Sequence, residues 1–169
     1  STKVDCIKYY GITKGTTATT YSPLDSVSRW QMALFLTRMA KVSGITLGDG
    51  SDQGFTDISG ESAEIQTAIN QIKQLGITTG KTATTYDPAS YVAREEMALF
   101  LTRLLKKAKV GPGGNSEFIS GNTGLKEIKS NDTDHNFLDL NTLALWESSP
   151  AIINLWNLGV TEVSTSTLY

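Results

Sequence analysis

Residues 76–106 read GITTGKTATTYDPASYVAREEMALFLTRLLK, and residues 11–41 read GITKGTTATTYSPLDSVSRWQMALFLTRMAK. The two stretches align without a gap at an offset of 65 residues, and 20 of the 31 aligned positions are identical. The shared positions include two loop glycines, a Tyr-x-Pro, an arginine and the run Met-Ala-Leu-Phe-Leu-Thr-Arg. Repetition at a fixed period of this length predicts a repeat architecture, in which neighbouring units bury each other's apolar faces.

A helix is predicted in front of the second copy of this stretch. Between Glu61 and Leu75 the apolar residues recur every three or four positions, and Gly76 with Ile77 follows as a typical helix end. The first ten residues, STKVDCIKYY, carry the same kind of apolar stripe before Gly11 and read as the last turns of such a helix. We therefore expect the chain to start inside a repeat.

A second helix is predicted in each copy, over residues 29–41 and 94–107. Each of these segments contains five consecutive apolar residues, which is more than one narrow amphipathic stripe requires. We expect both helices to be central and buried nearly all round. The loops that precede them are rich in Thr, Gly and Ala, a composition that favours ordered loops over further helix.

A third copy of the repeat begins further along the chain. Phe-Leu-Asp-Leu at 137–140 repeats Phe-Thr-Asp-Ile at 55–58. The helix of this copy is predicted to have Ser149 as its cap and Pro150 as its first helical residue, and to end at Gly159. The chain therefore holds one complete repeat between two partial ones.

The predicted fold class is all-α, built from tandem helix-loop-helix repeats. The repeats and connections divide the chain into a partial repeat at 1–41, a connection at 42–54, a complete repeat at 55–107, a linker or insertion at 108–136 and a partial repeat at 137–169. Within the insertion, EFIS and LKEIKS flank GNTG, a pattern that suits a small β-hairpin.

Composition excludes several functional classes. The net charge of -2, from 15 basic and 17 acidic residues, does not favour binding to nucleic acid or to an anionic membrane. No apolar run approaches the roughly 20 residues of a membrane-spanning helix, and no leader precedes Ser1, so we expect a mature, trimmed or fragmentary chain without membrane insertion. One cysteine and one histidine predict neither an internal disulfide nor a zinc site.

The order of elements resembles the S-layer homology (SLH) repeat. That repeat has Phe-x-Asp-hydrophobic, a helix ending in Gly-Ile, a Gly-rich loop, aromatic-x-Pro, and hydrophobic-x-Arg-x-Glu-hydrophobic-Ala. The resemblance covers nearly all of the chain except the two connections. It implies three repeats in a pseudo-threefold helical bundle, an extracellular place at the cell surface, and non-covalent attachment to cell-wall polysaccharide that often carries pyruvate ketals. It implies no catalysis and no cofactor.

The resemblance also implies candidate contacts for an anionic glycan. The Thr-Arg-Ala-Glu motif of the family falls on Ser28, Arg29, Trp30 and Gln31, and again on Ala93, Arg94, Glu95 and Glu96. A cation at the start of a helix faces the positive end of the helix dipole, which costs about 0.3–1 kcal/mol. A recurring arginine there is better explained by an anion beside it, bound by the guanidinium group and the amides of the helix start. A neighbouring Asp or Glu of the same fold could also be that anion, and so a solvated or structural arginine stays open.

Each of the other candidate contacts has a structural alternative. Gln31 and Glu96 have the residue type and spacing of capping groups. Trp30 could stack on a sugar, lie in a protein interface or be part of the core. Trp146 matches the tryptophan of the family repeat, although a core position would explain both it and Trp156.

The aspartates of the two connections are better explained as turn residues than as calcium ligands, and no catalytic constellation forms around His135. We therefore expect no enzyme and no metal. Two functions remain. The first is a secreted, non-catalytic module that binds anionic cell-wall polysaccharide. The alternative is a structural protein of a surface layer, an extracellular filament or a virus particle. In that case the repeats would contact copies of the chain or other structural proteins, in a larger chain or a homo-oligomer.

Overall fold

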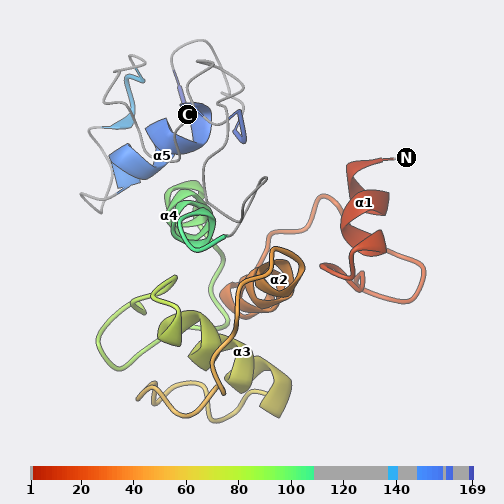
Figure 1. Cartoon of the computed structure of the whole chain (residues 1–169), viewed down its shortest axis with the longest axis vertical. Coiled ribbons are helices and arrows are strands. Elements are labelled where there is room, and N and C mark those ends of the chain that lie inside the picture. The colour runs from red at the N-terminus through yellow and green to blue at the C-terminus, as the bar shows by residue number, and fades with distance from the viewer. Residues whose placement is uncertain (1, 109–136, 141–147, 158, 162–167) are drawn as a thin grey trace. The chain divides into compact units, whose positions relative to one another are not determined.

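The computed structural model describes residues 2–108, 137–140, 148–157, 159–161 and 168–169. Within these residues it has five helices and no strand, which confirms the predicted all-α class (Figure 1). The helices are α1 (Lys3–Tyr9), α2 (Arg29–Val42), α3 (Ala63–Gln74), α4 (Arg94–Leu105) and α5 (Ser148–Asn157). The predicted hairpin in 108–136 lies outside the described residues from 109 onward, and the pseudo-threefold arrangement stays a prediction. None of the described helices has the length and hydropathy needed to cross a membrane.

The chain forms two compact units, residues 1–92 and 93–169. In the first unit α2 packs against α3, and in the second α4 packs against α5 (Figure 1). In both units the second helix of one repeat therefore packs against the first helix of the next repeat. Within the first unit, α1 packs against neither α2 nor α3.

Packing between α2 and α3 forms the core of the first unit. Positions 29–40 are buried or half-buried, whereas Lys41 and Val42 at the end of α2 are exposed. In the predicted helix 94–107 the two ends are also exposed, at Arg94 and at Lys106 and Lys107, so each helix is covered along its middle rather than throughout. Each fully buried Leu or Ile stabilises the fold by about 1.5–3 kcal/mol relative to an exposed one, so this contact dominates the stability of the unit. The buried apolar residues are Met32, Ala33, Leu36 and Ala40 on α2 and Ala68, Ile69 and Ile72 on α3.

An ion-pair network joins the same two helices at their surface. The Arg38 guanidinium on α2 lies 3.1 Å from the Glu64 carboxylate on α3, and the Lys14 ammonium lies 3.5 Å from the same oxygen. The hydrogen bond from Arg38, together with the charge of Lys14, holds the pKa of Glu64 below its ordinary value. Because Glu64 is exposed, this network adds little to the stability that apolar burial provides.

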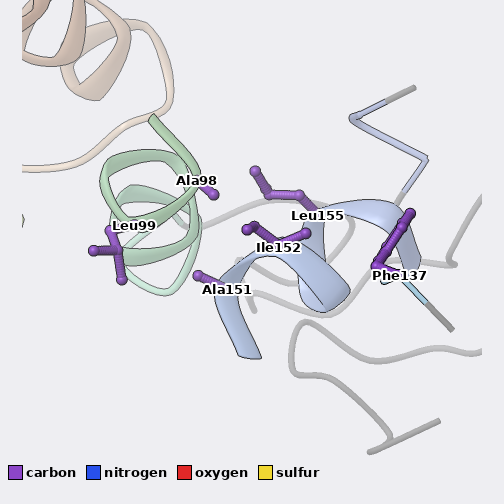
Figure 2. Packing of buried hydrophobic residues seen from close by; sticks show 6 residues of the cluster. All are labelled: Ala98, Leu99, Phe137, Ala151, Ile152 and Leu155. Carbon is purple, nitrogen blue, oxygen red and sulfur yellow. The ribbon is translucent and has the colours of Figure 1, made fainter. Parts of the chain in front are cut away.

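The second unit has the same kind of core between α4 and α5. Figure 2 shows Ala98 of α4 facing Ile152 and Leu155 of α5, with Phe137 at the far side of α5. The Thr102 hydroxyl on α4 donates a hydrogen bond of 3.2 Å to the carbonyl oxygen of Ala151 on α5. The backbone of α5 is thus tied directly to α4.

Four helices end on the same glycine motif. Gly11, Gly44, Gly76 and Gly159 all have φ between +69° and +72°, the left-handed region that favours glycine. At Gly76 the amide donates to the Lys73 carbonyl at 2.9 Å, and the amide of Ile77 donates to the Ile72 carbonyl at 2.9 Å. These bonds satisfy the last carbonyls of the helix. The ends predicted at Gly11, Gly76 and Gly159 are confirmed.

Helix α5 begins two residues earlier than its sequence predicts. Its first residue is Ser148, so Pro150 is the third helical residue and not the first. Proline is tolerated there because the amides of the first helical turn have no acceptor within the helix.

The connection that leads into the complete repeat is bound to the side of α3. The Asp49 carboxylate accepts hydrogen bonds from the Ser51 amide at 2.9 Å and the Gln74 side-chain amide at 2.7 Å. The Gln74 carbonyl oxygen in turn accepts from the Gly50 amide at 3.1 Å. The hydrogen bond from the Ser51 backbone, followed by that from Gln74, lowers the pKa of Asp49 to about 2. These contacts fix the loop before Phe55.

We expect Gly76→Ala to lower the free energy of unfolding by about 1–2 kcal/mol, because alanine is strained at a φ of +71° although nothing lies within 4 Å of the added Cβ. Gly60→Ala is the matched control, since its backbone is not in the left-handed region and its Cβ also meets nothing. Urea unfolding followed by circular dichroism measures both. Equal losses in the two variants would contradict the role of the left-handed helix end.

We expect Asp49→Asn to flatten the acid end of the stability profile. The pKa of Asp49 is about 2 in the folded chain and about 3.8 when unfolded, so its contribution is complete above pH 4. That contribution is lost as the pH falls from about 4 to about 2. Urea midpoints at pH 7, 4, 3 and 2 should therefore fall more steeply for the unmodified chain than for Asp49→Asn. Parallel profiles would count against the hydrogen bonds described for this carboxylate.

Candidate functional site

The arginine at the start of α2 is bound to the loop of the next repeat. The Arg29 Nε donates a hydrogen bond of 2.8 Å to the Tyr86 carbonyl, and the Tyr86 hydroxyl donates one of 2.8 Å to the Arg29 carbonyl. The guanidinium carbon lies 4.7 Å from the centre of the Tyr86 ring, within the range of a cation–π contact. Arg29 is only 2% exposed and Tyr86 is fully buried. We call this paired contact the Arg–Tyr clasp.

An aspartate fixes the tyrosine in position. The Asp57 carboxylate accepts hydrogen bonds from the Tyr86 amide at 2.9 and 3.1 Å and from the Asp87 amide at 2.7 Å. Asp87 has φ of +59°, a conformation that aspartate adopts more readily than most residues. Phe55 packs against the Tyr86 ring at a centroid distance of 5.7 Å. The Phe-x-Asp motif therefore positions the tyrosine that receives the arginine.

The same arrangement recurs in the second unit. The Arg94 guanidinium carbon lies 4.6 Å from the centre of the Tyr169 ring, and the Tyr169 amide donates a hydrogen bond of 3.2 Å to the Asp139 carboxylate. Arg94 is exposed, whereas Arg29 is buried. The contact between guanidinium and tyrosine ring thus occurs twice, each time between the second helix of one repeat and the loop of the next.

The first-turn amides of α2 have acceptors within the first unit. The Arg29 amide donates to the Ser90 carbonyl at 2.9 Å, and the Trp30 amide donates to the Pro88 carbonyl at 3.0 Å. The Gln31 amide donates to the Ser28 hydroxyl at 3.4 Å. These three backbone amides are therefore already hydrogen-bonded within the protein.

Gln31 and Glu96 act as capping groups at the starts of α2 and α4. The Gln31 side-chain oxygen accepts from the Ser28 amide at 2.9 Å, which completes a capping box. The Glu96 carboxylate accepts from the Ala93 amide at 3.1 Å, although Ala93 has no hydroxyl to return the bond. Their role as glycan contacts stays a prediction.

The start of α4 differs from the start of α2. In the part of the chain that the structure describes, the backbone amides of Arg94 and Glu95 have no acceptor. One carboxylate oxygen of Glu95 is buried and has no hydrogen-bond partner there. The first turn of α4 therefore has backbone amides without an acceptor and an exposed arginine, groups that can bind an anion.

The aromatic candidates occupy different environments. Trp30 is half-buried on the first turn of α2. Tyr91, which pairs with Ser28 in an antiparallel bridge, is 68% exposed and was not singled out by its sequence context. Trp146 lies outside the described residues. Among those residues, His, Cys, Asp and Glu side chains form no group that could hold a metal ion.

Comparison with known proteins supports one family. Residues 54–98 match the model of the S-layer homology domain, which confirms the predicted resemblance for this segment. A curated endoglucanase from Bacillus sp. (strain KSM-635) is 41% identical over 91 residues, which make up 53% of this chain. The chain spans only 9% of the length of that endoglucanase. Together the matches support a cell-surface attachment module in general, with an extracellular place at the cell surface.

We expect Tyr86→Phe to destabilise the chain by about 1 kcal/mol, because it removes the buried hydrogen bond to the Arg29 carbonyl and leaves that oxygen without this donor. Tyr91→Phe, at an exposed tyrosine, is the matched control and should change stability by less than about 0.5 kcal/mol. Thermal unfolding measures both variants. An unchanged melting temperature for Tyr86→Phe would show that the clasp contributes nothing through its hydroxyl.

Proposed function

We propose that this chain is a non-catalytic attachment module that binds anionic cell-wall polysaccharide, including pyruvylated polymer. The match of residues 54–98 to the S-layer homology domain supports attachment to the cell surface in general. The choice of an anionic glycan rests on the arginines that recur at the helix starts and on the family resemblance.

The observation that carries this proposal is the exposure of Arg94 beside unsatisfied polar groups. The Tyr169 ring holds the Arg94 guanidinium from one face at 4.6 Å, so the arginine loses little further side-chain entropy when it binds. A carboxylate of a pyruvate ketal would accept hydrogen bonds from this guanidinium and from the Arg94 and Glu95 amides. The helix dipole and the Arg94 charge favour an anion at this point.

Glu95 favours a sugar over a simple anion. Its carboxylate would repel a small anion, whereas a sugar can present a hydroxyl to it as a hydrogen-bond donor. The paired demand for an acidic group near Arg94 and a hydroxyl near Glu95 is met by an acidic saccharide. Glu96 would support this site indirectly by capping α4.

The start of α2 has a different part in the proposal. Arg29 is buried in the clasp, so its main contribution would be to hold the repeats together, and any glycan contact there would fall to its exposed surroundings. Trp30, half-buried on the same turn, stays a candidate stacking surface for a sugar ring. Gln31 would position this turn as a cap, and Trp146 stays a candidate through the family resemblance alone.

The endoglucanase match supports a module that accompanies other activities. Because the aligned residues are 9% of that protein, they are too small a part of it to carry over its activity. No described residues of this chain suggest a catalytic constellation, and the attachment role needs none.

A structural assembly role is the second candidate, and the exposed helix α1 favours it. Such a role would place protein contacts on the repeats of a surface layer or an extracellular filament. The comparisons give no support to the virus-particle alternative.

We expect Arg94→Ala to weaken retention by purified pyruvylated cell-wall polymer about ten-fold or more, because charge-assisted hydrogen bonds to the acid would be lost. Lys107→Ala, which removes an exposed charge just after the same helix, should leave retention unchanged. Co-sedimentation measures binding, and circular dichroism confirms that both variants are folded.

The same polymer after mild acid removal of its ketals separates the acid from the sugar contribution. Retention of the unmodified chain should fall to the level of Arg94→Ala. If Arg94→Ala binds the intact polymer as well as the unmodified chain does, the anionic-glycan site at α4 is wrong.

A further inference from the structure

The loop before α4 contains an Asp–Pro bond. The four prolines of the chain follow Ser22, Asp87, Gly111 and Ser149, so Asp87–Pro88 is the one bond of this kind in the sequence. An aspartate carboxylate can reach its own backbone carbonyl carbon by closing a five-membered ring. The proline nitrogen is a tertiary amide nitrogen, which takes up a proton more readily than a secondary one and is therefore a better leaving group.

The backbone at this bond is strained. Asp87 has φ of +59°, whereas a residue before proline favours extended backbone with a negative φ. Such a conformation persists only where the surrounding structure holds it. Here the Asp57 carboxylate accepts a hydrogen bond from the Asp87 amide at 2.7 Å, and the Trp30 amide donates one to the Pro88 carbonyl at 3.0 Å. The bond is therefore held from both sides in a conformation that cleavage would relieve.

The carbonyl group of the same bond is polarised by a serine. The Ser90 hydroxyl donates a hydrogen bond of 3.2 Å to the Asp87 carbonyl oxygen, where it would stabilise negative charge that develops on that oxygen. Within the described residues the Asp87 carboxylate forms no hydrogen bond and no ion pair, so no partner holds it away from the carbonyl. All of these groups belong to the first compact unit.

We propose that the chain cleaves itself between Asp87 and Pro88. A carboxylate oxygen of Asp87 bonds to the Asp87 carbonyl carbon, and the carbonyl oxygen takes the negative charge beside the Ser90 hydroxyl. The bond from this carbon to the proline nitrogen then breaks, and the nitrogen leaves with a proton from a solvent acid. Water opens the cyclic anhydride that remains on Asp87. The net reaction consumes one water molecule and yields fragments 1–87 and 88–169.

The first unit would keep the two fragments together after cleavage. The segment 88–92 is hydrogen-bonded to the start of α2 and to the residues before it. Besides the bond from Trp30 to Pro88, the Val92 amide donates to the Val27 carbonyl at 3.0 Å. We therefore expect the cleaved chain to elute as one species in size-exclusion chromatography and to separate in urea.

The first copy of the loop provides an internal control. Ser22, before Pro23, has φ of +56°, and the Asp25 amide donates a hydrogen bond of 3.1 Å to the Ser22 carbonyl. This bond thus has a strained backbone and a polarised carbonyl, but a serine in place of the carboxylate. It should stay intact, and Ser22→Asp should create a second cleavage point.

The test incubates the full chain at pH 4 and 37 °C, where solvent acid supplies the proton. Intact-mass spectrometry follows the fragments, and circular dichroism at the same pH checks that the helices are present. We expect cleavage between residues 87 and 88 and none between 22 and 23. Asp87→Ser, which introduces the residue of the first copy, should abolish cleavage.

A peptide of residues 82–92 measures the same bond without the fold. The full chain should cleave roughly five-fold faster than the peptide, because only the fold holds the strained φ and the Ser90 hydrogen bond. Ser90→Ala should slow the chain by several-fold and leave the peptide unchanged. Equal rates in chain and peptide would show only the ordinary acid lability of an Asp–Pro bond and would overturn the proposal. A chain that stays intact, or a Ser22→Asp variant that is cut only at residue 87, would also overturn it. None of these readouts depends on glycan binding.

Discussion

Burial between consecutive repeats is the constraint on which the structure depends. In the first unit the two helices of the first repeat, α1 and α2, do not pack on each other. Instead α2 packs on α3 and α4 on α5, so each contact joins two repeats. A helix of this length is marginal alone in water, and its stability comes from the apolar face that a neighbour covers. The clasp and the glycine helix ends add specific hydrogen bonds around this contact. The covered apolar face supplies most of its free energy of folding.

The clasp explains why an arginine stands where the helix dipole disfavours it. Arg29 offsets that cost through a tyrosine ring and a backbone carbonyl, and its own carbonyl receives the tyrosine hydroxyl. Arg29, which the sequence proposes as a glycan contact, is thus also a residue that joins two repeats. In the second unit the exposed Arg94 keeps the same ring contact, so a structural and a recognition role can coexist at one position.

Much of the fold could be predicted from the repeated stretch. Local spacing of apolar residues predicts the helix that contains Ile69 and Ile72 and the burial of most of α2. The glycine at position 76 predicts where the first of these helices ends. The pairing of Arg29 with Tyr86 joins residues 57 positions apart, and a single sequence carries no measure of that proximity. The recurrence of Tyr86 and of Phe-x-Asp at equivalent positions was the available signal. The start of α5 was misplaced because proline is compatible with several positions of a first turn.

The contacts of α2 with α3 and of α4 with α5 also show that the predicted sequence repeats and the compact units are different segments of this chain. The predicted complete repeat, 55–107, contains one helix from each of two cores. The compact unit of residues 1–92 instead contains the packed pair of α2 and α3 with the clasp. If one repeat is gained or lost, the second helix of one repeat still meets the first helix of the next, so a contact of the same kind forms. Such an array can change length by whole repeats while its core contacts stay the same. A substitution in the contact between two repeats, by contrast, requires a compensating change in the neighbouring repeat.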